Sequence, residues 1–226
     1  MAEKDWLLGD TPNPLGDRID EIRENIKKKK PENLASKTGA IYTPEEESAP
    51  NELEGGNFKL PFWSQEVIIR FPDFTGQFAE TGDPVNTFDM TMLAYYFDVC
   101  DGAPMTNEWI AFNQIPGGLF YAQAFQGYSG NELAKAFGND AEAFIEANEK
   151  LGGRREFFGN VAFSYQVLPR VPIMVVCWLG DEDFPPSYRI LFDSNAHHHL
   201  VTDAYAILGS HLTRRLIKAK NVTTQP

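Results

Sequence analysis

Apolar and polar positions recur along the chain with two periods, and these periods predict where helices and strands lie. Apolar residues spaced three and four apart indicate helices, whereas short runs of alternating or continuous apolar residues indicate strands. Helices are expected over 17–30, 82–102, within 116–138, 140–153 and 202–219. Strands are expected over 58–63, 66–71, 108–115, 160–168, 171–179 and 188–193.

The order of these elements favours one fold class. Helix, strands, helices, strands and a final helix follow one another, and segregated strands of this kind are typical of α+β proteins. We expect a single α+β domain over 17–220, with an antiparallel or mixed sheet and helices packed on it. An irregular segment (1–16), an acidic loop (44–57) and a short tail (221–226) complete the chain.

Local signals set the expected helix boundaries. Pro31 should end the first helix, because proline disrupts a helix interior. Asp83 is the expected N-cap of the next long helix, with Pro84 at its first position. Asn139 should cap the helix that Gly152 closes.

Composition narrows the classes of partner. The 226-residue chain carries a net charge of −12, which argues against a nucleic-acid binder, since phosphate neutralisation needs clustered Lys and Arg. The basic clusters at 27–30 and 214–220 suit the C-terminal turns of helices. No apolar run is long enough for a membrane span and no signal-peptide pattern is present, so we expect a soluble, cytoplasmic protein.

The two cysteines, Cys100 and Cys177, argue against metal clusters. Neither lies in a CxxC pattern, so we expect free thiols and no iron–sulfur cluster in this chain. Ser164 and Ser210 have no elbow glycines, and Cys100 has no base evident in the sequence, which disfavours nucleophilic hydrolysis. Gly117 lies in "IPGGLFY", where a tight turn is favoured over an anion-binding loop.

The second half of the chain resembles a known family. Its matching text is "MLAYYFDVCDGAPMTNEWIAFNQIPGGLFYAQAF", then "LGG", then "LPRVPIMVVCWLGDEDFPPSYRILFDSNAHHHL". These segments are similar to the bacterial and archaeal family called domain of unknown function 3786, and the resemblance covers most of 27–219. Some relatives carry an additional four-cysteine iron–sulfur domain of a type also found in corrinoid iron–sulfur proteins. The resemblance implies anaerobic organisms and a link to corrinoid or one-carbon chemistry.

Three consecutive histidines follow the last expected strand. If this stretch is extended, His197 and His199 share one face and His198 lies on the other. One histidine backed by aromatic side chains such as Trp178 and Phe184 would suffice as the axial ligand of a corrinoid (cobalamin) or haem. The Asp-x-His-x-x-Gly signature of base-off cobalamin modules is absent. In the alternative interpretation, the histidines are solvated residues at a strand end or a helix start.

The acidic turn "GDEDFPPS" gives a second candidate site. Adjacent carboxylates repel, so one pKa would rise if Asp181 and Asp183 were buried together, and that group could serve as an acid or base. A divalent metal could bind Asp181, Asp183, Asp193 and His199 if the fold brings them together. The alternative is a hairpin loop whose acids face water.

The family resemblance, more than the residues themselves, favours a non-catalytic ligand-binding module and implies its ligand and partner. Its expected ligand is a corrinoid or other tetrapyrrole, and its expected partner a corrinoid protein or methyltransferase of anaerobic one-carbon metabolism. A metal-assisted enzyme using the acidic turn, Asp193 and the histidines is one alternative. A purely partner-binding domain with an acidic face is another, and self-association is left open.

Overall fold

The structure, a computed structural model, describes residues 19–45 and 55–222. This part of the chain forms two antiparallel sheets and seven α-helices, which confirms the predicted α+β class. The strands divide between two sheets, whereas the sequence pattern suggested one. The expected irregular segment 1–16 and most of the acidic loop lie outside the described residues. Among the described helices, none combines the length and apolar character needed to cross a bilayer.

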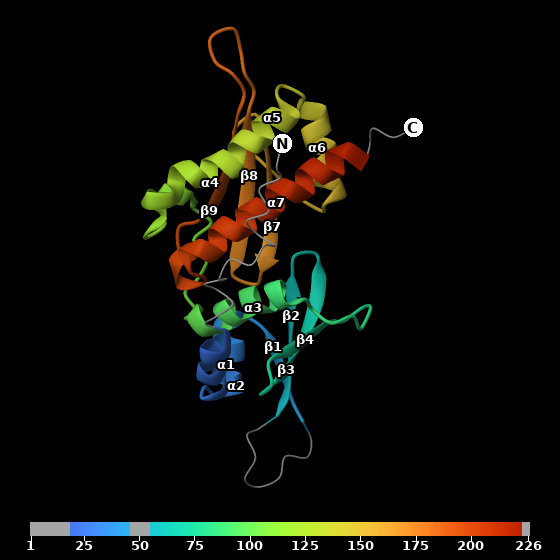
Figure 1. The fold of residues 1–226 in the computed structure, drawn as a ribbon, viewed down its shortest axis with the longest axis vertical. Coiled ribbons are helices and arrows are strands. Elements are labelled where there is room, and N and C mark those ends of the chain that lie inside the picture. Colours follow the sequence, from blue (N-terminus) through green and yellow to red (C-terminus); the bar gives the residue numbers. More distant parts are fainter. Residues whose placement is uncertain (1–18, 46–54, 223–226) are drawn as a thin grey trace, which may run out of the picture.

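The smaller sheet has the order β1-β2-β3-β4, and every pair is antiparallel. Its strands are β1 (Ile41–Pro44), β2 (Gly56–Phe62), β3 (Gln65–Phe71) and β4 (Thr75–Phe78). Alternation in β2 buries Phe58, Leu60 and Phe62 and exposes the residues between them, as expected for a sheet with one covered face. The helices beside it are α1 (Ile19–Lys27), α2 (Pro31–Thr38) and α3 (Thr87–Val99) (Figure 1).

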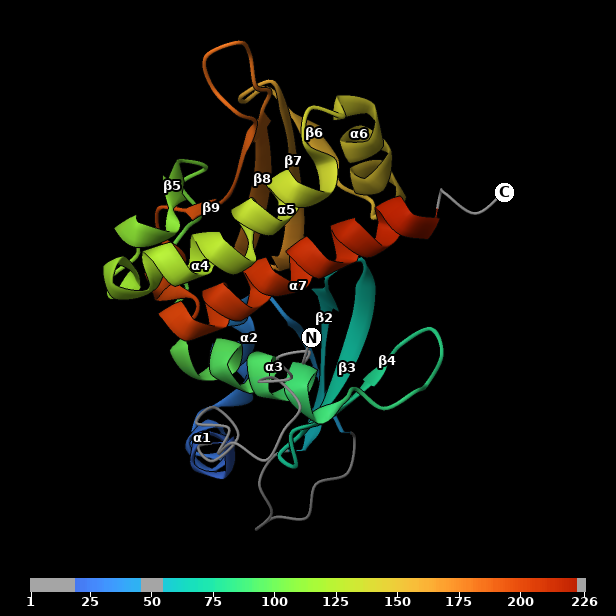
Figure 2. The same cartoon turned by 45° about the horizontal axis from the view of Figure 1, so that its top comes forward.

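The larger sheet has the order β5-β9-β8-β7-β6, again antiparallel throughout. Its strands are β5 (Trp109–Ala111), β6 (Arg154–Glu156), β7 (Val161–Leu168), β8 (Val171–Trp178) and β9 (Ser187–Asp193). Four helices follow or interrupt these strands, namely α4 (Ala122–Tyr128), α5 (Gly130–Phe137), α6 (Ala141–Lys150) and α7 (Thr202–Val222). Figure 2 shows α4, α5 and α7 lying across one face of this sheet.

Buried aromatic rings form the centre of each half. Phe97 of α3 lies 5.0 Å from the ring of Phe58 and 5.2 Å from that of Phe74, and all three side chains are buried. In the other half, Phe192 of β9 lies 5.2 Å from Tyr205 of α7. Large rings bury much apolar area per residue, so each cluster stabilises the half of the domain in which it lies.

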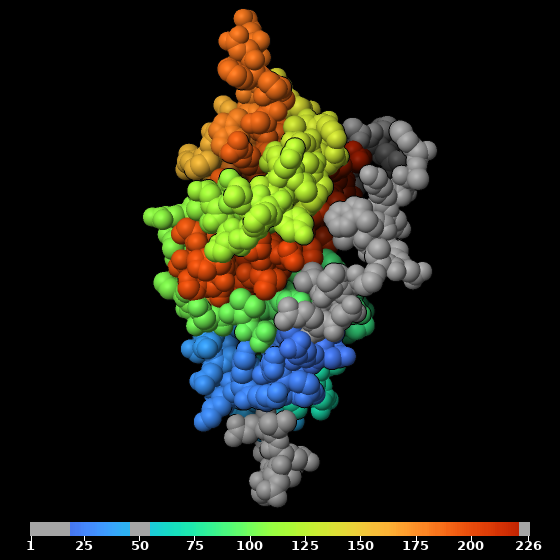
Figure 3. Space-filling view, turned by 60° about the vertical axis from the view of Figure 1, so that its left-hand side comes forward, coloured from blue at the N-terminus to red at the C-terminus, as the bar shows by residue number. Residues whose placement is uncertain are grey.

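Hydrogen bonds join the two halves at several points, of which two lie near the ends of strands. The backbone N–H of Trp63, at the tip of the β2–β3 hairpin, donates to the carbonyl of Val167 in β7 at 2.7 Å. The Nε of Arg170, in the β7–β8 turn, donates to the carbonyl of Lys37 at the end of α2 at 2.6 Å. The halves therefore stack along one axis, with α1, α3, α7 and α4 following each other in the space-filling view (Figure 3).

The apolar pattern predicts the long elements well and the short ones poorly. All six expected strands and the expected helices are present, whereas β1, β4 and β6, of three or four residues each, are not predicted. The region 116–138 contains two helices, α4 and α5, where one short helix was expected. Short strands contain too few residues for a period to be visible.

Two predicted N-caps are wrong, and one helix is not predicted. The first helix ends before Pro31, as expected, but Pro31 itself begins α2, because proline is well suited to the first turn of a helix. Asn86, not Asp83, caps α3, and its side chain accepts a backbone N–H of the first turn at 3.0 Å. Asp140, not Asn139, caps α6 in the same way, also at 3.0 Å.

Removal of the Phe97 ring should destabilise the smaller half strongly. We expect Phe97→Ala to lower the free energy of unfolding by about 3–5 kcal/mol, because it leaves a cavity among buried rings. The measurement is urea unfolding followed by circular dichroism. The matched control is Phe120→Ala, since Phe120 is 91% exposed and its loss should change stability by less than about 0.5 kcal/mol. Equal losses in both variants would contradict this account of the core.

Candidate functional site

The three histidines lie in a tight turn and not in an extended stretch. Residues Ala196–His198 form a short 3-10 helix between β9 and α7, so the alternation expected of a strand is wrong here. His197 is exposed, and His198 Nδ1 lies 2.6 Å from Asp101 Oδ2. His199 is completely buried. The rings of His197 and His198 lie 4.2 Å apart, but His199 is enclosed, so the three side chains do not form one ligand set.

His199 is paired with a cysteine that is distant in the sequence. Its Nδ1 lies 3.5 Å from the Sγ of Cys100, and this thiol lies 3.1 Å from the carbonyl of Lys37. Its Nε2 is buried and has no hydrogen-bond partner among the described residues. No sequence pattern indicates this pair, because only the packing of the histidine turn against the end of α3 brings the two residues together.

The electrostatics of this pair oppose a catalytic role. Burial lowers the pKa of His199 to about 4 and raises the pKa of the Cys100 thiol. Each shift disfavours the charged form. A nucleophilic cysteine needs the opposite arrangement, a thiolate stabilised by a protonated imidazole. At neutral pH, Cys100 and His199 are therefore an uncharged, buried pair.

Asp193 accepts hydrogen bonds from three backbone amides. Its carboxylate accepts from Thr106 at 2.9 Å, from Asn107 at 2.8 Å and from Asn195 at 2.9 Å, and its side chain is 1% exposed. Backbone amides satisfy a buried carboxylate without a counter-charge. The predicted metal ligand therefore has its oxygens occupied by the chain itself.

These bonds fix the connection between α3 and β5, residues 101–108, which has no regular secondary structure. Besides the bonds to Asp193, the Nδ2 of Asn195 donates to the carbonyl of Pro104 at 2.9 Å. The hydroxyls of Thr106 and Ser194 lie 2.7 Å apart. The turn that contains the histidines thus holds this connection against the end of β9.

The acidic turn lies far from the histidines. It forms the loop between β8 and β9, which protrudes at the top of Figure 1. The Oδ1 of Asp181 accepts the backbone N–H groups of Asp183 and Phe184, each at 2.9 Å, and these bonds lower the pKa of Asp181. Phe184 is exposed, while Trp178 is half-buried and contacts Phe158. A raised carboxylate pKa is therefore not found at Asp181.

The residues predicted to bind one metal are not brought together. The acidic turn lies before the first residue of β9, whereas Asp193 is the last residue of β9 and His199 follows it. At the usual rise per residue of a strand, the two ends of β9 are about 20 Å apart. In residues 19–45 and 55–222, no three His, Cys, Asp or Glu side chains form a group that could hold a metal ion.

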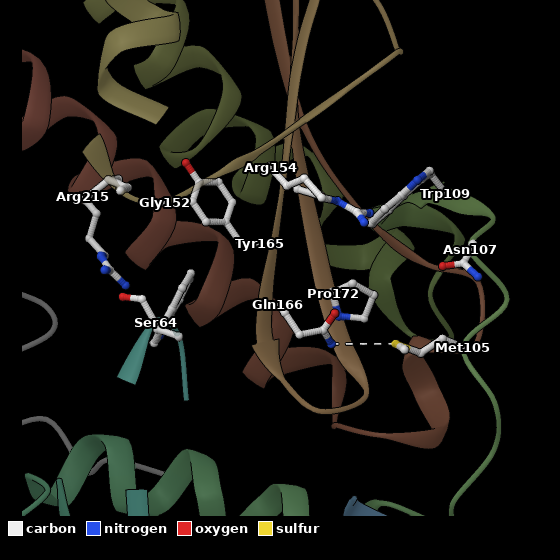
Figure 4. Close-up of a pocket in the computed structure, with 13 residues that line it drawn as sticks. Ser64, Met105, Asn107, Trp109, Gly152, Arg154, Tyr165, Gln166, Pro172 and Arg215 are labelled. Atoms are coloured by element: carbon white, nitrogen blue, oxygen red, sulfur yellow. Dashed lines mark hydrogen bonds between the residues drawn. The ribbon is translucent and has the colours of Figure 1, made fainter. Parts of the chain in front are cut away.

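A pocket lies elsewhere, where the two halves meet. It has a volume of about 340 Å³ and is drawn in Figure 4. The tip of the β2–β3 hairpin, β7, α7 and the end of the α3–β5 connection supply most of its walls. Its lining residues are Trp63, Ser64, Met105, Asn107, Trp109, Leu151, Gly152, Arg154, Ser164, Tyr165, Gln166, Pro172 and Arg215. Its volume is within the range of small-molecule sites.

Two of the lining residues have an unusual backbone conformation. Trp63 has φ = 54° and Asn107 has φ = 59°, and among the described non-glycine residues only Phe74 shares this property. A bulky residue such as Trp63 is strained at positive φ and persists there only where its surroundings determine it, whereas asparagine adopts this conformation more readily. Trp63 is fixed by its bond to Val167, and Asn107 by its bond to Asp193.

Arg215 contributes a positive charge to one end of the pocket. Its guanidinium lies 4.7 Å from the centre of the Trp63 ring, and in Figure 4 its side chain points toward Ser64. Partial burial lowers its pKa. At the other end, Arg154 forms an ion pair with Glu156 at 2.7 Å. The sequence pattern does not predict the residues that line this pocket as a binding site. Arg215 was noted there only as part of the basic end of the last helix.

Comparison with known proteins places the chain in a family. Residues 30–215 match the family model described as domain of unknown function (DUF3786). The chain belongs to the DUF3786 family. The matched region includes both sheets, the histidine turn and every residue that lines the pocket, so these features are parts of the DUF3786 domain itself. The chain matches no curated protein and no solved structure at a significant level.

Acidification should reveal the buried His199. An unfolded histidine binds a proton below about pH 6.5, whereas His199 in the folded DUF3786 domain has a pKa of about 4. Between these values the unfolded state binds more protons, so stability rises with pH and is lost as pH falls.

We expect His199→Gln to remove up to about 1.4 kcal/mol per pH unit from the slope of unfolding free energy between pH 4 and 6.5. Urea unfolding across this range measures the slope, and comparison with the wild type cancels other titrating groups. The exposed His197→Gln is the control and should retain the wild-type slope. An unchanged slope in His199→Gln would show that His199 titrates normally.

Loss of the Asp193 carboxylate should loosen the α3–β5 connection. Asp193→Ala leaves three amides without their acceptor, and we expect a loss of about 3–5 kcal/mol in stability. Hydrogen exchange of the Thr106 and Asn107 amides should accelerate more than exchange in β8. Asp183→Ala, on the exposed loop, is the control. Slow exchange at Thr106 and Asn107 in Asp193→Ala would contradict this role.

Proposed function

We propose that this DUF3786 domain is a non-catalytic module that binds a small molecule in the pocket between the hairpin tip, β7 and α7. The observation that carries the proposal is the strained backbone of Trp63, a bulky residue with positive φ in the pocket wall. Such conformations cluster at functional sites, where the strain can keep a wall in place before a ligand arrives. Trp63 is held by its hydrogen bond to Val167, in a distant part of the chain.

The chemistry of the walls supports binding rather than catalysis. None of the described residues that line the pocket is a histidine, cysteine, aspartate or glutamate. Two serines line it, but no histidine stands beside them as a base, and the hydroxyl of Ser164 donates to Glu156, which is already paired with Arg154. The hydroxyl of Tyr165 donates to Asn148 Oδ1 at 2.7 Å, and burial raises its pKa, so it is poorly suited to release a proton. The uncharged Cys100 lies outside the pocket.

A corrinoid or haem ligand stays a prediction. In its favour, His199 Nε2 is a buried nitrogen without a partner among the described residues. Axial ligation there would require the histidine turn to open, because His199 has no exposed surface. A corrinoid protein or methyltransferase as partner, and a metal-assisted reaction, are predictions of the same kind. The pocket needs no such rearrangement and is therefore the first site to test.

Binding can be mapped with the tryptophan indole signals. We expect small aromatic fragments to shift the indole N–H resonances of Trp63 and Trp109 in ¹⁵N-labelled protein, because both rings line the pocket. Trp178 lies outside it and serves as an internal control. The fragment set contains acids, neutral amides and amines of similar size. If none of them shifts Trp63 or Trp109, or if Trp178 responds equally, the pocket is not a binding site.

Addition of hydroxocobalamin to the same sample distinguishes a corrinoid bound at His199 from a small molecule bound in the pocket. A change in its visible spectrum that is lost in His199→Gln would support axial ligation. Shifts confined to Trp63 and Trp109, with an unchanged cobalamin spectrum, would support the pocket alone.

A further inference from the structure

We infer that the ligand of this pocket is a small organic anion, whose carboxylate or phosphate group is bound by Arg215 and whose flat apolar body lies along the pocket. This inference rests on the proposed function and names the class of molecule that the site accepts. It follows from the environment of Arg215, from the charge of the walls and from the polar groups that are already paired.

The guanidinium of Arg215 contacts an aromatic ring and keeps its hydrogen-bond donors. Its Cζ lies over the Trp63 ring, 4.7 Å from the ring centre, and this cation–π contact uses none of the N–H donors. No hydrogen bond or ion pair joins these donors to any residue in the described part of the chain. A planar fork of donors of this kind matches the two oxygens of a carboxylate or phosphate.

A nearby carboxylate does not neutralise Arg215. Asp89 of α3 is close enough to influence the pKa of Arg215, but it is not within ion-pair distance. Asp89 instead accepts a hydrogen bond from the Nδ2 of Asn86 at 2.7 Å. Arg215 is therefore a half-buried positive charge without a counter-ion among the described residues, and charges that lose water are normally paired. An anionic ligand would provide the missing partner.

The charge of the pocket is opposite to that of the chain. The whole chain has a net charge of −12, yet no acidic side chain is among the described lining residues, and both charged ones are arginines. Arg154 is already paired with Glu156, which also accepts from the hydroxyl of Ser164 at 2.6 Å. Arg215 is thus the single strong binding point for an anion, which favours a ligand with one acidic group.

The rest of the pocket suits a flat apolar body. Trp109 and Pro172 supply apolar surface away from Arg215, and the hydroxyl of Tyr165 already donates to Asn148. The amide of Gln166 donates to the carbonyl of Leu168 at 2.6 Å. Ser64 and Asn107 also line the pocket, so apolar contact with Trp109 and Pro172 would act beside some polar wall in binding the body of the ligand.

Three probes of equal ring size test the charge requirement. Benzoate and phenyl phosphate carry the two kinds of anionic group, and benzamide is the neutral counterpart of benzoate. Titration of ¹⁵N-labelled protein gives a dissociation constant for each probe from the indole shifts of Trp63 and Trp109. We expect at least one anion to bind more tightly than benzamide, and their order tells a carboxylate site from a phosphate site.

Arg215→Gln removes the charge and should weaken the preferred anion by about tenfold to a hundredfold, the range for a hydrogen bond to a charged group. Benzamide binding should change little. The matched control is Arg214→Gln, which makes the same charge change at the neighbouring, exposed position outside the pocket. Arg215→Lys keeps the charge without the planar fork and should lie between wild type and Arg215→Gln.

Each outcome decides a different point. If benzamide binds as tightly as the anions and Arg215→Gln has no effect, the anion inference is wrong while the proposed pocket stands. If Arg214→Gln weakens the anion as much as Arg215→Gln does, the effect is a general one of net charge, and the inference is also wrong. If no probe shifts Trp63 or Trp109, both proposals fail. If Arg215→Gln does not fold, Arg215→Lys tests the anion inference instead. Weaker anion binding with unchanged benzamide binding would support the inference, and unchanged anion binding would contradict it.

Discussion

The structure depends on how one buried carboxylate, Asp193, is satisfied. A charge without water must find hydrogen bonds, and Asp193 finds them in the backbone of the α3–β5 connection and of its own turn. This requirement brings residues 101–108 to the end of β9. The same contact places the end of α3 beside the histidine turn, and it sets Asn107 in the wall of the pocket. Fold and candidate site thus share one electrostatic constraint.

The pocket arises where the two halves of the domain meet, and neither half contains it alone. The smaller sheet supplies Trp63 from the tip of a hairpin, while the larger sheet and α7 supply Tyr165 and Arg215. The hydrogen bond from Trp63 to Val167 attaches the tip of the β2–β3 hairpin to β7 of the larger sheet. Sites at such junctions are common, because two rigid elements can hold a concave surface that one element cannot. The DUF3786 match includes both halves, as a junction site requires.

Periodicity was sufficient for the fold class and the long elements, because β2, β7, β8 and α7 carry their burial pattern in neighbouring residues. It failed where long-range packing decides. The histidines read as a strand end, but the bonds of Asp193 and Asn195 favour a tight turn, and Cys100 becomes a neighbour of His199 only through that turn. The sequence pattern placed Trp63 at the end of a strand and Arg215 near the end of a helix. The contact between these two side chains depends on how the two halves pack together, so no local sequence pattern predicts it.

The burial of both cysteines has a consequence for how readily this domain is oxidised. Cys100 and Cys177 are enclosed, and burial raises the pKa of each thiol, so little thiolate forms at neutral pH. Oxidants and electrophiles attack the exposed thiolate, and both conditions are missing at these two sulfur atoms. The two thiols of this chain therefore give the domain no site of ready oxidation.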